Sequence, residues 1–70
     1  MPNEIQIVVN GESRSVPPGA TVADLLSALA LPPGRVAIER NFEILPRPQW
    51  AATRIEPTDR YEIVQFVGGG

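Results

Sequence analysis

Residues 4–16 read Glu-Ile-Gln-Ile-Val-Val-Asn-Gly-Glu-Ser-Arg-Ser-Val and carry the strongest local folding signal in the chain. Apolar residues at positions 5, 7 and 9 alternate with their neighbours at the period of a half-buried strand. Asn10 and Gly11 tolerate the positive φ angles of a type I′ turn. The segment therefore predicts a β-hairpin, with strands at 4–9 and 12–16.

One amphipathic helix is predicted after this hairpin. The Thr21 hydroxyl can accept a backbone N–H of the first turn, and Asp24 three positions later approximates a capping box. An apolar stripe follows at helical spacing over about ten residues, and Pro-Pro-Gly at 32–34 ends it. The stripe consists of Val22, Leu25, Leu26 and Leu29.

The rest of the chain predicts short extended pieces separated by turns. Pro46 and Pro48 flank Arg47, so regular structure is not expected there before residue 49. The expected elements are strands at 36–40, 43–45 and 61–67, turns at 41–42, 49–52 and 57–59, and a brief extended piece at Ile55.

A single helix must bury its stripe, and a sheet with one apolar face is the available surface. The first and last strands are apolar enough to lie centrally in that sheet. We therefore expect an α+β fold of the β-grasp, ubiquitin-like type, with a four- to five-stranded mixed sheet packed on one main helix. Residues 1–67 would form one domain, and residues 68–70 a flexible glycine tail.

Composition excludes several classes of function. The 70 residues contain no Cys, His or Lys, which removes thiol nucleophiles, the usual general base and side-chain amines. The net charge of −2 argues against nucleic acid as a partner. No apolar run approaches the roughly 20 residues that span a bilayer, and no signal peptide is evident. A non-enzymatic, cytoplasmic protein without membrane contact is expected.

Four side chains are weaker candidates for chemistry. Glu39 and Glu43 are expected to be solvated charges rather than an acid–base pair or ligands of a hard cation. Trp50 is expected to cap the edge of the core. Arg47 either pins its loop by bonding to carbonyls or faces an acidic partner.

The chain ends with Gly68, Gly69 and Gly70, for which composition leaves two interpretations. The glycines are either a frayed end or cloning remnant, or a tail that enters another protein's narrow active site and presents the Gly70 carboxylate. Val64 and Phe66 are apolar, yet the strand period turns them away from the core. They form either a docking surface beside the tail or extra burial against a loop.

Three stretches resemble the thiamine-pathway sulfur carrier family (ThiS): the Asn-Gly hairpin, residues 36–50 and residues 59–70. The pattern Asn-x-x-Ile-Leu-Pro-Arg-x-x-Trp at 41–50, together with the terminal glycines, carries the resemblance. The chain has one additional glycine, Gly68, before the pair that occupies the family's positions.

This resemblance implies a carrier that partner enzymes act on. A ThiF-like adenylyltransferase would consume ATP to adenylate the Gly70 carboxylate, and a sulfur donor such as a cysteine desulfurase would convert it to a thiocarboxylate. Thiazole synthase (ThiG) would accept the sulfur, and the chain itself would bind no cofactor or metal.

Two alternatives stay open from the sequence. One is a carrier of the same type for molybdopterin synthesis, similar to the small subunit MoaD. The other is a ubiquitin-like module that binds partners non-covalently and whose tail is inert.

Overall fold

The computed structural model describes residues 3–66, which form a five-stranded mixed sheet in the order β2-β1-β5-β3-β4. The central pair β1–β5 is parallel, and the pairs β1–β2, β3–β5 and β3–β4 are antiparallel. The β-grasp prediction is confirmed. The elements are β1 (Ile5–Val9), β2 (Glu12–Val16), α1 (Val22–Ala28), η1 (Pro33–Arg35), β3 (Val36–Arg40), β4 (Glu43–Ile44), η2 (Arg47–Ala52) and β5 (Arg60–Gln65).

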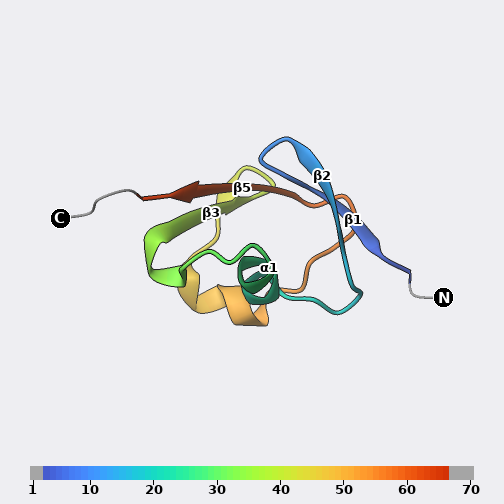
Figure 1. Ribbon diagram of the computed structural model, residues 1–70, viewed down its shortest axis with the longest axis horizontal. Helices are drawn as coiled ribbons and strands as arrows, with labels where there is room; N and C mark the ends of the chain where they lie inside the picture. The colour runs from blue at the N-terminus through green and yellow to red at the C-terminus, as the bar shows by residue number, and fades with distance from the viewer. Residues whose placement is uncertain (1–2, 67–70) are drawn as a thin grey trace.

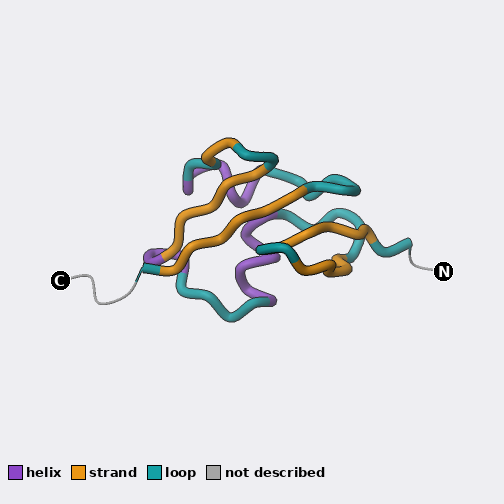
Figure 2. Tube along the Cα trace, turned by 90° about the horizontal axis from the view of Figure 1, so that it is seen from above, coloured by secondary structure: helices purple, strands orange, loops and turns teal. Residues whose placement is uncertain are grey.

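The helices α1 and η2 lie together on one side of the sheet (Figure 1). Seen from above, the strands run side by side across the molecule (Figure 2). The core fills the space between these two layers and includes Val22, Leu25 and Leu26 of the predicted apolar stripe, whereas Leu29 is only partly buried against it. Its members are Ile7, Val9, Val16, Ala20, Val22, Leu25, Leu26, Val36, Ile38, Trp50, Ile55, Tyr61 and Ile63.

Helix α1 begins as predicted but is shorter than the predicted ten residues. The Thr21 hydroxyl accepts from the Asp24 N–H at 3.2 Å, and the Asp24 carboxylate accepts from the Thr21 N–H at 2.9 Å, which completes a capping box. The helix ends after seven residues, well before the prolines. No helix in residues 3–66 is long and apolar enough to span a bilayer.

A Schellman motif causes this early end. Ala30 has φ 57°, and its N–H donates to the Ser27 carbonyl at 3.0 Å. The Leu31 N–H donates to the Leu26 carbonyl at 3.1 Å, which is the 6→1 bond of the motif. Glycine is the usual residue at this left-handed position, and its absence explains why the sequence pattern missed the boundary.

Two expectations for residues 46–52 are wrong. Regular structure begins at Arg47 as the 3₁₀ helix η2, because proline is well tolerated in the first turn of a helix, where its missing N–H has no partner to lose. Trp50 is not a cap at the core edge: it is buried within the core, and its indole N–H donates to the Leu45 carbonyl at 2.8 Å. Arg47 lies over the Trp50 ring at 5.9 Å.

A buried polar cluster around Asp59 joins β3, the following turn and β5. One Asp59 oxygen accepts from Arg40 Nε at 3.0 Å, the Tyr61 hydroxyl at 2.8 Å and the Glu56 N–H at 2.9 Å. The other oxygen accepts from the Asn41 side-chain amide at 3.1 Å. Asp59 is only 5% exposed, so these four donors replace the water that it would otherwise bind.

The cluster holds Asp59 in its charged form. Burial acts most strongly and would raise the pKa of Asp59, but the four donors, led by the Glu56 N–H, outweigh burial and lower this pKa below its ordinary 3.8. Burial and the bond to Asp59 raise the pKa of the Tyr61 hydroxyl, so it remains a proton donor. The cluster is therefore stable as a carboxylate with protonated partners.

Replacing Ala30 with glycine should stabilise the protein. Glycine removes the Cβ strain at φ 57°, so we expect Ala30→Gly to raise the free energy of unfolding by about 0.5–1 kcal/mol in chemical denaturation. Ala28→Gly is the matched control, since Ala28 is exposed and helical, and it should lower this free energy by about 0.5–1 kcal/mol. Equal effects of both substitutions would contradict the assignment of the motif.

Removing the Asp59 charge should destabilise the protein at neutral pH. Because folding lowers the pKa of Asp59, its contribution is full above the ordinary pKa and is lost as the pH falls through the folded-state value. We expect Asp59→Asn to lower the free energy of unfolding by about 2–4 kcal/mol at pH 7. The difference from wild type should shrink below about pH 4.

Urea unfolding from pH 7 down to pH 3 measures this change. Glu56→Gln is the control, because its carboxylate is exposed and only its backbone N–H enters the cluster. A difference between wild type and Asp59→Asn that did not vary with pH would show that the Asp59 charge is not the cause.

Candidate functional site

Within residues 3–66 no element covers the face of the sheet opposite α1 (Figure 1), and this face carries the candidate site. Along β5 the buried Tyr61 and Ile63 alternate with the exposed Glu62 and Val64. Strand β3 alternates in the same way, with its residues Ala37 and Glu39 exposed. Residues directly opposite each other on paired strands share a face, so these outward side chains form one surface.

We call this surface the open face. Its core consists of two cross-strand pairs, Ala37 opposite Val64 and Glu39 opposite Glu62. Ile44 of β4 lies opposite Glu39 and adds a third strand to it. A shallow cavity of about 210 Å³ lies on this face and is lined by Ala37, Ile38, Glu39, Ile44, Glu62 and Val64.

The two predicted docking residues are exposed, as the strand period indicated. Val64 is 58% exposed, and Phe66, which continues the same alternation, is 52% exposed. Neither residue is therefore part of the core. Two further large apolar side chains, Phe42 and Ile44, are 74% and 78% exposed. The sequence did show Ile44 as part of a short strand, but only the β3–β4 pairing places it on the open face.

Phe42 occupies an unusual backbone conformation. Asn41 and Phe42 form the predicted turn between β3 and β4 and have φ angles of 52° and 71°, as a type I′ turn requires. This region is costly for a bulky aromatic residue. The Phe42 ring lies 5.5 Å from the Arg60 guanidinium, and Asn41 Oδ1 accepts from the Arg60 N–H at 2.9 Å. The Phe42 ring thus contacts Arg60, while Asn41 connects the turn to the start of β5.

The end of β5 is held from both sides up to the last described residue. On one side the Asn10 side chain continues the ladder beyond β1, because its Oδ1 accepts from the Ile63 N–H at 2.8 Å and its Nδ2 donates to the Ile63 carbonyl at 3.1 Å. On the other side the Phe66 N–H donates to the Arg35 carbonyl at 2.7 Å. The hairpin-turn residue Asn10 therefore also anchors β5.

The predicted tail residues Gly68, Gly69 and Gly70 lie outside the described residues, as does Val67. The structure thus places the docking candidates and the strand that leads toward the tail, and the role of the tail remains a prediction.

The structure does not bring Glu39 and Glu43 together. Glu39 lies opposite Ile44 on the open face. Glu43 lies opposite Arg40 in the strand register, so it belongs to the other face of the hairpin. Within residues 3–66 no three acidic side chains lie close enough to hold a metal ion. Arg47 makes no hydrogen bond to a carbonyl in this part of the chain and lies over Trp50 instead. Glu39 and Glu43 therefore lie on different faces of the β3–β4 hairpin.

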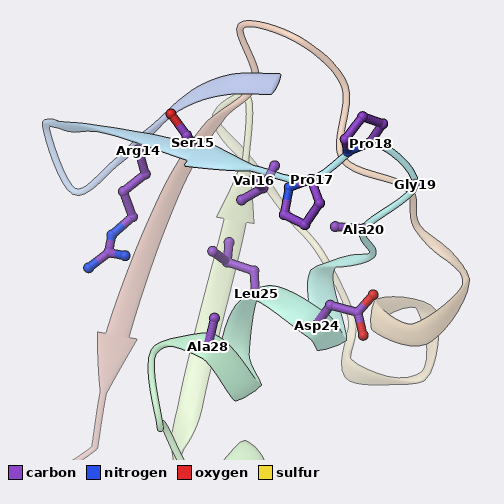
Figure 3. Close-up of a pocket in the computed structure, with 10 residues that line it drawn as sticks. All are labelled: Arg14, Ser15, Val16, Pro17, Pro18, Gly19, Ala20, Asp24, Leu25 and Ala28. Carbon is purple, nitrogen blue, oxygen red and sulfur yellow. The ribbon is translucent and has the colours of Figure 1, made fainter. Parts of the chain in front are cut away.

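A second concave region, of about 370 Å³, lies between β2 and α1. Val16, Leu25 and Ala28 lie at its centre, with Arg14 and Asp24 at its two ends (Figure 3). The Asp24 carboxylate already caps α1, so this region offers no free acid or base pair for catalysis.

Comparisons with known proteins agree on one family. The ThiS family model matches residues 7–70. The chain is 32% identical over 66 residues to the sulfur carrier protein ThiS of Escherichia coli K12, which covers 94% of this chain and all of that protein. The crystal structure of a ThiS protein from Geobacter metallireducens superposes with a TM-score of 0.80 at 35% identity, covering 94% of this chain and all of the other.

The chain also resembles part of a larger protein. It is 41% identical over 66 residues to the thiazole synthase of Paramagnetospirillum magneticum, and the match covers 94% of this chain. The chain spans only about a fifth of the length of that synthase and of the similar synthase from Magnetococcus marinus. Fold, family model and full-length relatives agree: this chain belongs to the ThiS family.

Proposed function

We propose that this protein is the sulfur carrier of thiazole formation in thiamine biosynthesis and acts in the cytoplasm. The observation that carries the proposal is the family match, which extends through the three terminal glycines. The full-length match to a sulfur carrier protein supports it further.

The proposed chemistry takes place at the Gly70 carboxylate. A ThiF-like adenylyltransferase binds ATP, the carboxylate attacks the α-phosphorus, and pyrophosphate leaves to give an acyl-adenylate. The persulfide of a donor such as a cysteine desulfurase then attacks the acyl carbon and expels AMP, which gives an acyl disulfide between Gly70 and the donor. A thiol cleaves the S–S bond of this intermediate, which releases the thiocarboxylate and leaves the donor in a disulfide with that thiol. Inorganic sulfide, as used in the test below, expels AMP and gives the thiocarboxylate directly. Activation is needed because a carboxylate is a poor electrophile, whereas AMP is a good leaving group.

The residue inventory is consistent with this route. Without Cys, the chain has no side chain that could carry sulfur as a persulfide, and without Lys it has no side-chain amine that would attack its own activated terminus. The partner enzymes therefore supply catalysis and sulfur and consume ATP, and the carrier supplies recognition and the acceptor carboxylate.

Gly68 and Gly69 are proposed to pass through a narrow channel in the partner, since glycine has no Cβ to obstruct close approach. Val64 and Phe66 are proposed to dock beside this channel. The double anchoring of β5 by Asn10 and Arg35 supports this role, because it fixes the strand from which the chain continues toward the tail.

Thiazole synthase is proposed as the enzyme that accepts the sulfur. Two relatives named thiazole synthase contain a segment similar to this chain, and that segment makes up a fifth of each. A carrier-like segment joined to a synthase supports a functional pairing of the two activities.

The intact mass of the chain tests the proposed chemistry. After incubation with ATP, the adenylyltransferase and sulfide, we expect a mass increase equal to the replacement of one oxygen by sulfur. This mass increase should be lost in a variant truncated before Gly70. An unchanged mass with an adenylyltransferase that demonstrably turns over another carrier would leave a non-covalent binding module as the better function.

Phe66→Ala should weaken binding to the adenylyltransferase more than it lowers stability, because about half of this side chain is exposed. We expect affinity to fall about tenfold or more in calorimetry, with less than about 1 kcal/mol lost from the free energy of unfolding. Ile63→Ala is the control, since Ile63 is buried and should lose about 2–4 kcal/mol of stability. A large stability loss for Phe66→Ala with unchanged affinity would place Phe66 in the core instead.

A further inference from the structure

We propose that Glu39 and Glu62 on the open face bind an arginine side chain of the partner enzyme. This inference rests on the proposed function, because it assumes that the open face docks to the enzymes that act on Gly70. It identifies the chemical group on those enzymes that the face recognises.

The two glutamates lie directly across from each other on paired strands, so their negative charges repel each other in the free protein. Glu39 and Glu62 are direct cross-strand neighbours on one face of an antiparallel pair. Like charges in this arrangement destabilise a sheet. No compensating cation is paired with them, since the ion pair recorded in residues 3–66 joins Arg40 to Asp59. Arg60 is the nearest basic residue along β5, and its guanidinium lies over Phe42.

The surroundings of the pair favour a guanidinium over other cations. The shallow cavity that contains both glutamates is also lined by Ala37, Ile44 and Val64, which are apolar. A guanidinium is planar and weakly hydrated, so its faces and alkyl stem can lie on such side chains while its edge donates to two carboxylates. A lysine ammonium is a strongly hydrated point charge and would lose more hydration there.

A metal ion is a poorer occupant. Calcium takes six to eight oxygen ligands and magnesium six, and no third acidic side chain joins this pair within the described part of the chain. A second copy of the chain brings six arginines of its own, so self-association is measured as a separate outcome of the test. An arginine from a different protein fits the charge and the apolar walls together.

The test compares Glu39→Gln/Glu62→Gln with a control of equal charge change, Glu4→Gln/Glu12→Gln. Glu4 and Glu12 are exposed and lie away from the β3–β5 pair. Calorimetry would measure affinity for the ThiF-like adenylyltransferase and for thiazole synthase at low and high salt. Thermal unfolding and intact mass after the sulfur-transfer reaction at saturating enzyme would be recorded for the same proteins.

We expect the face variant to lose about tenfold or more in affinity for at least one enzyme, and the control to stay within about twofold of wild type. The wild-type affinity should fall more steeply with salt than that of the face variant. The thermal unfolding midpoint of the face variant should be equal to or above that of wild type, because the variant lacks the two opposed charges. This combination separates recognition from a structural role.

The proposal is overturned if the face variant binds both enzymes as tightly as wild type while wild type still gains sulfur. It is also overturned if wild type self-associates in sedimentation and the variant does not, which would assign the face to a second copy. A wild type that gains no sulfur with an active adenylyltransferase would instead reject the proposed function. Gain of sulfur by the face variant at saturating enzyme would show that its tail chemistry is intact.

Discussion

Strand β5 hydrogen-bonds to β1 on one side and to β3 on the other, and the placement of the candidate site depends on this double pairing. A strand in the centre of a sheet cannot rotate or slip without breaking both ladders, so its period-two alternation is enforced. Tyr61 and Ile63 must therefore enter the core, and Glu62 and Val64 must face outward. The same constraint that builds the core exposes the proposed docking residues.

The buried cluster around Asp59 fixes the position of the start of β5. Its carboxylate gathers donors from β3, the Asn41 turn and Tyr61, and so connects the β3–β4 hairpin to the start of β5. A charge this deeply buried is stable only when its donors are all in place. The cluster thus fixes the turn that contains Phe42 beside Arg60 at the start of β5. Near the end of β5, the Asn10 side chain fixes the strand by accepting from the Ile63 N–H.

The open face and the adjoining β3–β4 turn contain several features that do not favour folding. Phe42 occupies a left-handed conformation, Ile44 is largely exposed to water, and two glutamates oppose each other across paired strands. Each costs free energy in the isolated chain, whereas the face beneath α1 shows well-matched packing and satisfied polar groups. These costs agree with the docking role proposed for this region of the molecule.

The sequence by itself determined the local elements and the fold class, because these follow from short-range signals. Alternation predicts strands, Asn-Gly predicts the hairpin turn, Thr21 with Asp24 predicts the helix start, and the resemblance at 41–50 and the tail indicates the family. Only the tertiary structure decided the early end of α1, the burial of Trp50, and the meeting of Glu39 with Glu62. These depend on a left-handed alanine and on the β3–β5 register, which bring together residues distant in the chain and leave no local signature.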